Sequence, residues 1–177
     1  MAITFLDKIT LGVGNSSLTS ASADTSGADF LAVHVGHYSV AFTVSDSKGN
    51  TWRTGITDRT DGEAVTEIRY AWAPTVGTGH TFTSSLGGGY QVAWAAWFSG
   101  VQTASDPLDQ QNGAAADRSP GTGITPTTDN QLVLCGHSAN GNVTSINGGF
   151  TAIYTQNYVG GTNEGGGFAY LIQTTAA

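Results

Sequence analysis

The feature that most constrains this chain is the alternation of short apolar runs with turn residues between Tyr38 and Phe98. Within these runs apolar residues recur at every second position, which is the period of a β-strand. Clusters of Gly, Asp, Asn, Ser and Pro separate the runs and are typical of turns. No helical period persists beyond about two turns anywhere in the chain. The sequence therefore predicts an all-β protein.

The same pattern continues on both sides of this stretch and predicts one domain over residues 1–177. Roughly nine to eleven strands at a spacing of about 8–12 residues are typical of a sandwich or barrel. We expect an antiparallel β-sandwich that is jelly-roll-like, with an immunoglobulin-like Greek key as the alternative. The expected strands cover residues 2–11, 16–22, 30–38, 40–46, 51–59, 64–74, 80–86, 90–98, 131–139, 149–156 and 166–175.

Two local expectations follow from the turn residues and the alternation. Asp46 to Asn50 is the clearest turn signal, because Asp46 can accept hydrogen bonds from the amides ahead of it and Gly49 readily takes a positive φ. This turn predicts a hairpin between residues 40–46 and 51–59. In residues 64–74 the two alternating sets of side chains differ in polarity, which predicts a half-exposed strand.

A long connection separates the eighth expected strand from the ninth. Residues 99–130 contain three of the four prolines and show no apolar period. Loops of this length are usually functional or cross the edge of a sheet. We therefore expect an excursion from the sandwich at this point.

Charge excludes several classes of function. The chain has 6 Lys and Arg against 13 Asp and Glu, a net charge of −7. Nucleic-acid binding needs a basic surface, so we expect no nucleic-acid partner. An anionic membrane surface is disfavoured for the same reason, and no apolar run approaches the roughly 20 residues of a membrane span. The first residues lack the pattern of a signal peptide, which predicts a chain that starts inside a cell.

Few residues suggest metal or catalytic chemistry, and we expect no cofactor. His34 and His37 are three positions apart on one strand, so their side chains should point to opposite faces. Cys135 and His137 share a face but lack an orienting third group. Asp46, Asp58 and Asp61 populate two neighbouring loops and are weak calcium candidates, although the spacing of a calcium-binding loop is absent. Turn bonding explains Asp46 and Asp61 without a metal.

Aromatic residues offer the strongest indication of a binding site. Exposed Trp and Tyr rings can stack on the apolar faces of sugars, while Asn, Gln and Asp bind the hydroxyl groups. The candidate glycan-binding residues are Trp97, Trp52, Tyr158 and Asn163. Trp97 is the first to test, because it lies on the alanine-rich face of its strand. The alternative for Trp97 is that the long loop or another subunit covers it.

Several motifs resemble a module that is widespread in phage and bacterial proteins. They are a Val-Ser-Asp-x-x-Gly-Asn-Thr turn, a Tyr-Ala strand, a Gly-His-Thr-Phe-Thr strand and a Phe-Ser-Gly-Val strand end before Pro-Leu-Asp. The matching positions are Val44 to Thr51, Tyr70-Ala71, Gly79 to Thr83, Phe98 to Val101 and Pro107 to Asp109. The resemblance extends from about residue 25 onward.

The resemblance implies a β-sandwich of phage virion proteins, such as head fibres, capsid decorations and tail appendages, or of secreted bacterial proteins. It implies no catalytic residues, so we expect a non-enzymatic protein located on the virion. The alternative is an extracellular carbohydrate-binding module. The expected partners of the virion protein are other virion proteins or further copies of the same chain, for example in a trimer, together with glycans. Modules of this kind generally continue into one more strand after Gln173. In this chain that strand is either missing or supplied by a partner, and the second alternative would suit assembly by strand addition.

Overall fold

The structure is a computed structural model that describes residues 1–38, 41–61, 64–113 and 123–176. These residues form eleven β-strands and no helix, so the all-β prediction is confirmed. Each expected strand has a counterpart at nearly the expected position. The strands are β1 (Thr4–Gly14), β2 (Leu18–Thr19), β3 (Phe30–Tyr38), β4 (Phe42–Asp46), β5 (Arg53–Asp61), β6 (Ala64–Trp72), β7 (Phe82–Leu86), β8 (Gln91–Ser99), β9 (Gln131–Ala139), β10 (Thr151–Gln156) and β11 (Gly165–Gln173).

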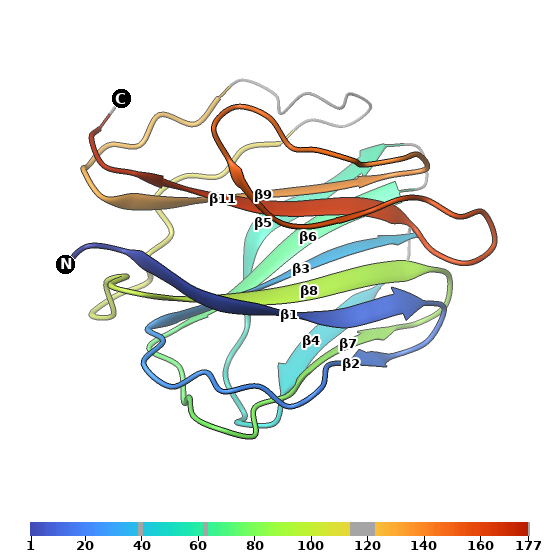
Figure 1. Cartoon of the computed structure of the whole chain (residues 1–177), viewed down its shortest axis with the longest axis horizontal. Helices are drawn as coiled ribbons and strands as arrows, with labels where there is room; N and C mark the ends of the chain where they lie inside the picture. Colours follow the sequence, from blue (N-terminus) through green and yellow to red (C-terminus); the bar gives the residue numbers. More distant parts are fainter. Residues whose placement is uncertain (39–40, 62–63, 114–122, 177) are drawn as a thin grey trace.

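The described strands form three antiparallel sheets that pack together as a β-sandwich. The central sheet has the strand order β1-β8-β3-β6-β5. The sheet β10-β11-β9 covers one of its faces, and the sheet β2-β7-β4 covers the other (Figure 1). The molecule therefore has two hydrophobic cores, one on each side of the central sheet.

Strands β3 and β8 lie at the middle of the central sheet and are buried on both faces. One face of β8 places Trp94 and Phe98 against β10 and β11, where Phe168 and Ile153 complete the core. The other face places Trp97 against the small sheet β2-β7-β4. Both faces of these strands are apolar in the sequence because neither face reaches water.

The expectation of a half-exposed strand at residues 64–74 is wrong. In β6, Ile68 and Tyr70 point into one core and are buried, as expected. The opposite face is also covered, since Glu67 and Ala71 are no more than 9% exposed. Glu67 pairs with Arg69 at 2.6 Å, and this ion pair lets a carboxylate occupy a largely buried position.

The hairpin expected around Asp46 is wrong as well. Strand β4 pairs with β7 in the small sheet, whereas β5 pairs with β6 in the central sheet. The Asp46 carboxylate accepts hydrogen bonds from the amides of Lys48 and Asn50, and Gly49 has the expected positive φ of 74°. The Asn50 side chain then bonds the backbone of Thr75, which directs the chain away from β4. The turn itself was predicted, but it carries the chain from one sheet to another.

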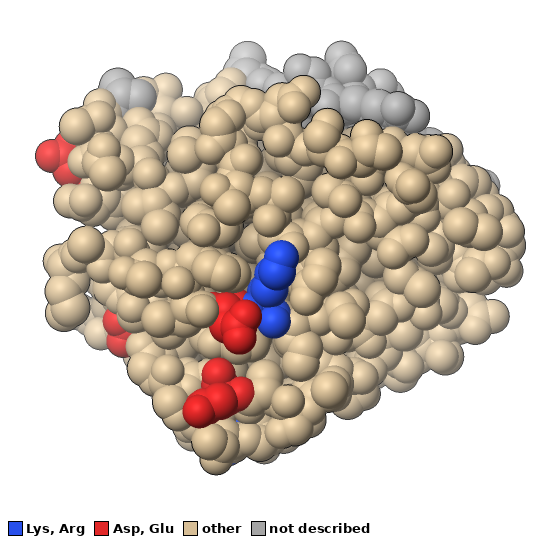
Figure 2. Space-filling view, viewed as in Figure 1, with Lys and Arg blue, Asp and Glu red and all other residues tan. Residues whose placement is uncertain are grey.

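The surface bears few ionised groups. Figure 2 shows one face of the molecule, on which acidic and basic side chains are sparse among neutral residues. The two termini lie at the same end of the sandwich (Figure 1). Among the described residues, no helix has the length and apolarity that crossing a membrane requires.

Candidate functional site

A groove lies between β9 and the long connection that precedes it. Its volume is about 1140 Å³. Strand β9 forms one side, and residues 107–113, 123–124, 126 and 128–130 of the connection form the other. Parts of β6 and of the segment 142–150 also line the groove, together with Met1, Ile3, Phe30, Gly55 and residues 100–102. The length of the connection predicted a functional excursion, and the described part of that excursion borders this groove.

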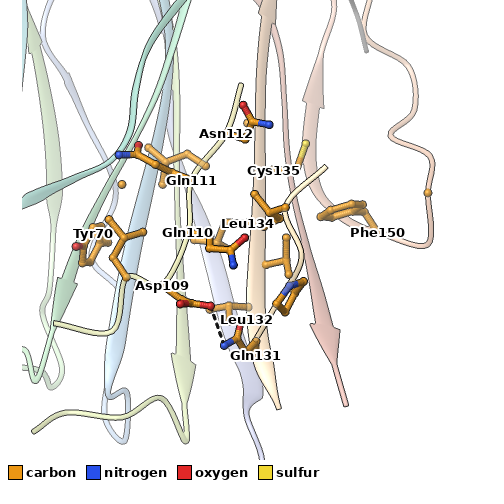
Figure 3. Close-up of a pocket in the computed structure, with 18 of the residues that line it drawn as sticks. Tyr70, Asp109, Gln110, Gln111, Asn112, Gln131, Leu132, Leu134, Cys135 and Phe150 are labelled. Carbon is orange, nitrogen blue, oxygen red and sulfur yellow. Dashed lines mark hydrogen bonds between the residues drawn. The ribbon is translucent and has the colours of Figure 1, made fainter. Parts of the chain in front are cut away.

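Strand β9 contributes a free edge to the groove. In the described residues it pairs only with β11, and the sheet order β10-β11-β9 leaves its other edge without a partner strand. In Figure 3 the segment carrying Asp109, Gln110, Gln111 and Asn112 lies beside this strand. Backbone polar groups at such an edge remain available to water or to a ligand.

Side-chain hydrogen bonds fix the outer wall of the groove. The Gln110 amide donates to the Thr125 carbonyl at 2.8 Å and accepts from the Thr125 amide at 3.1 Å, as a neighbouring strand would. Asp109 Oδ2 accepts from the Thr127 hydroxyl at 3.0 Å and from Gln131 Nε2 at 3.3 Å (Figure 3). These bonds tie the two arms of the connection to each other and to the start of β9.

The same hydrogen bonds set the charge of Asp109. The donors Thr127 and Gln131 stabilise the carboxylate and lower the pKa of Asp109 below its ordinary value. Asp109 is exposed and lines the groove. An ionised carboxylate is a strong acceptor for hydroxyl groups.

A second anchor holds the beginning of the connection on the central sheet. The buried Tyr70 donates its hydroxyl hydrogen to Asp106 Oδ1 at 2.6 Å. Burial, and then the Asp106 carboxylate, raise the pKa of Tyr70 above its ordinary value. The phenol therefore stays protonated and remains a donor to Asp106 at neutral pH.

The rest of the groove is largely apolar. Leu132 and Leu134 project from β9 and pack partly against the core, and Phe150 is half-buried beside the same strand (Figure 3). Cys135 also lines the groove, but burial raises the pKa of its thiol. A thiol in this state is a weak nucleophile. The arrangement thus combines polar acceptors with apolar surface and is suited to binding.

The structure places the predicted glycan-binding tryptophans away from this groove. Trp97 is 2% exposed and stacks on Phe82 at a centroid distance of 6.1 Å. It is covered by the small sheet β2-β7-β4, so the expectation of an accessible ring is wrong there. Trp52 is half-buried, donates its indole hydrogen to Asp46 Oδ2 at 2.8 Å and packs on the same core.

The other two predicted residues lie together in the loop between β10 and β11. Asn163 is 2% exposed, and its side-chain oxygen accepts a hydrogen bond from the Val159 amide at 2.7 Å. It therefore closes a turn and has no surface for a ligand. Tyr158 is half-buried in this loop, outside the lining of the groove. The four residues are not brought together into one site.

The calcium candidates do not form a site in the described residues either. The side chain of Asp46 is buried, and its carboxylate accepts hydrogen bonds from two backbone amides and from Trp52. The side chains of Asp58 and Asp61 lie outside the described part of the structure. Within that part, no three His, Cys, Asp or Glu side chains converge as metal ligands would.

A hydroxyl, a histidine and a carboxylate line up elsewhere in the fold. The Thr25 hydroxyl bonds His80 Nδ1 at 2.8 Å, and His80 Nε2 lies 3.4 Å from Asp46 Oδ1. This order is that of a nucleophilic triad. All three side chains are buried, however, so no substrate reaches the hydroxyl. We interpret the row as a structural link between β4, β7 and the loop before β3.

Sequence reasoning therefore identified the loop that carries the groove but missed its residues. The available signal was the run Asp106 to Asn112, which concentrates carboxylates and amides a few residues after the apolar strand β8. Its partners Thr125 and Gln131 lie beyond residue 122, and their contact with the run depends on how the connection folds back.

Comparisons of the chain with protein-family models, with curated proteins and with solved structures found no match. The resemblance to phage virion modules stays a prediction.

Proposed function

We propose that this chain is a non-enzymatic structural protein of a phage virion, acting as a capsid decoration, head fibre or spike module that also binds glycans. The observation that carries the adhesive part is the groove beside β9. It combines a free strand edge, an ionised Asp109, several amide side chains and an apolar floor. Polyhydroxylated ligands with apolar ring faces match this combination of acceptors and apolar surface.

The structural part of the proposal is supported by the low content of charged residues and by the sequence resemblance. Assembly with other virion proteins or with further copies of the chain would use free strand edges, as strand addition does. Light scattering over a range of protein concentrations tests this part. We expect an oligomer, for example a trimer, and a monomer at every concentration would contradict self-assembly.

A glycan array with the full chain tests the adhesive part. We expect binding to at least one glycan class, and Gln110→Ala should weaken it by roughly five- to tenfold, because the loss of two hydrogen bonds releases the wall at Thr125. Gln156→Ala is the matched control, since Gln156 lies on β10 outside the groove. Equal weakening by both variants, or binding to no glycan, would refute the groove as an adhesion site.

The same groove also supports the alternative, a carbohydrate-binding module of a secreted bacterial protein. Both functions involve glycan binding. They differ in whether the domain is part of a phage particle or of a secreted bacterial protein. Incorporation into purified phage particles favours the first function, and secretion by a bacterial host favours the second.

A further inference from the structure

The groove differs from many anion-binding sites in the sign of its charge. Its described lining contains two carboxylates, Asp109 and Asp129, and no Lys or Arg side chain; it also includes Met1, which carries the N-terminal ammonium, and the imidazole of His137. A ligand that lies beside Asp109 therefore meets a negative charge held in place by hydrogen bonds.

Asp109 can distinguish neutral sugars from acidic ones because of its position in the groove. It lines the groove, and its Oδ2 accepts hydrogen bonds from Thr127 and Gln131, which orient the carboxylate. A vicinal pair of sugar hydroxyls can donate to this carboxylate. The carboxylate of an acidic sugar has no hydrogen to donate at neutral pH and is repelled by Asp109.

Asp129, at the end of the groove, is a second carboxylate that repels acidic sugars. Its Oδ1 accepts a hydrogen bond from the Ala176 amide at 2.7 Å, so its position is also fixed. The two carboxylates flank the start of β9, where Gln131 bonds both Asp109 and Thr128. A ligand that lies along β9 passes close to this end of the strand.

We infer that the groove selects neutral glycans and discriminates against acidic ones, with Asp109 as the residue that determines this specificity. This inference rests on the proposed adhesive function. It names the class of ligand at the same site and excludes sialylated and uronate-containing chains from that class.

The test uses pairs of glycans that differ only in charge, with the full chain as the receptor. Suitable probes are galacto-oligosaccharides beside oligogalacturonates, and lactose beside sialyl-lactose. We expect the acidic member of each pair to bind at least about tenfold more weakly at low salt, and the difference to shrink as salt screens the charges. Equal or tighter binding of the acidic member overturns the inference but leaves glycan adhesion intact. Binding of neither member overturns both.

The variant Asp109→Asn separates the charge of this residue from the shape of the groove. It removes the negative charge and keeps one oxygen acceptor, so discrimination against the acidic probes should fall several-fold. Asp24→Asn is the matched control, because Asp24 is also exposed and hydrogen-bonded, by the Ser26 amide at 2.9 Å, but does not line the groove. Unchanged discrimination in Asp109→Asn, or an equal loss in Asp24→Asn, overturns the assignment to Asp109.

Discussion

At the scale of single residues, the burial of Trp97 determines what its replacement will do. The indole is enclosed between the central sheet and Phe82, so Trp97→Ala leaves a cavity in a closed core. We expect a loss of about 3–5 kcal/mol in the free energy of unfolding, measured by urea denaturation. The variant Trp97→Phe retains an aromatic contact with Phe82, so its free energy of unfolding should fall by less than that of Trp97→Ala. A Trp97→Ala protein as stable as the parent would contradict the described packing.

His34 should make the protein sensitive to acid. The ring is fully buried, stacks between Trp94 and Phe168, and bonds the Thr66 hydroxyl at 2.8 Å. Burial, followed by the positive charges of His137 and His37, lowers the pKa of His34 from 6.5 to about 3. The unfolded chain therefore binds a proton more readily than the folded one. Stability contributed by neutral His34 is complete above pH 6.5 and is lost as the pH falls toward 3.

The variant His34→Gln tests this linkage, because glutamine cannot take up the proton but can still reach Thr66. Its free energy of unfolding should be lower than that of the parent at pH 7.5 and should depend less on pH between 6.5 and 4. Urea titrations at several pH values measure both quantities. An unchanged pH dependence would show that His34 does not carry the effect.

At the scale of elements, the segment from Asp46 to Trp52 decides how the sheets are connected. The buried carboxylate of Asp46 accepts hydrogen bonds from two backbone amides and from the Trp52 indole. Asp46→Ala removes these bonds and leaves buried donors without partners, so we expect a loss of roughly 2–4 kcal/mol in the free energy of unfolding. Asp24→Ala, which removes an exposed carboxylate bonded to one amide, should cost less than about 1 kcal/mol. Similar losses in the two variants would contradict this role.

The elements also show what the sequence could predict. The alternation of Val92, Trp94 and Phe98 with Ala93 and Trp97 was sufficient to place β8 and to assign its two faces. It did not reveal that both faces are covered, because the alternation of residues identifies a strand but not the sheets that pack on its two faces. The nearly unbroken apolar character of β3 and β8 was the available signal for a central sheet between two others.

The residue types at the turn after β4 predicted its local conformation correctly, but they did not predict which strand pairs with β4. Asp46 and Gly49 behave as their residue types suggest. The partner strand of β4 is β7, about forty residues later in the chain, and the pairing depends on the contact of Asn50 with Thr75. Trp97 was misassigned for another reason: the alternation shows which face of β8 it occupies, but not that the preceding strand β7 folds over that face and places Phe82 on the indole.

At the scale of the whole molecule, the sandwich provides a rigid support for one open groove. Two cores fix the central sheet, and β9 remains at the edge of the outer sheet with the long connection beside it. The candidate site therefore combines a strand of the support with a loop held by side-chain bonds. Composition predicted a surface with few charged side chains, but only the folded chain brings Asp109 to Gln131.

The most direct test of this account is a map of backbone amide shifts by nuclear magnetic resonance, recorded while a neutral oligosaccharide from the array is added to the full chain. The account predicts shift changes concentrated in residues 107–113 and 131–138, with the amides around Trp97 and Asn163 unaffected. Changes centred on the β10–β11 loop or on the sheet β2-β7-β4, with none along β9, would contradict it.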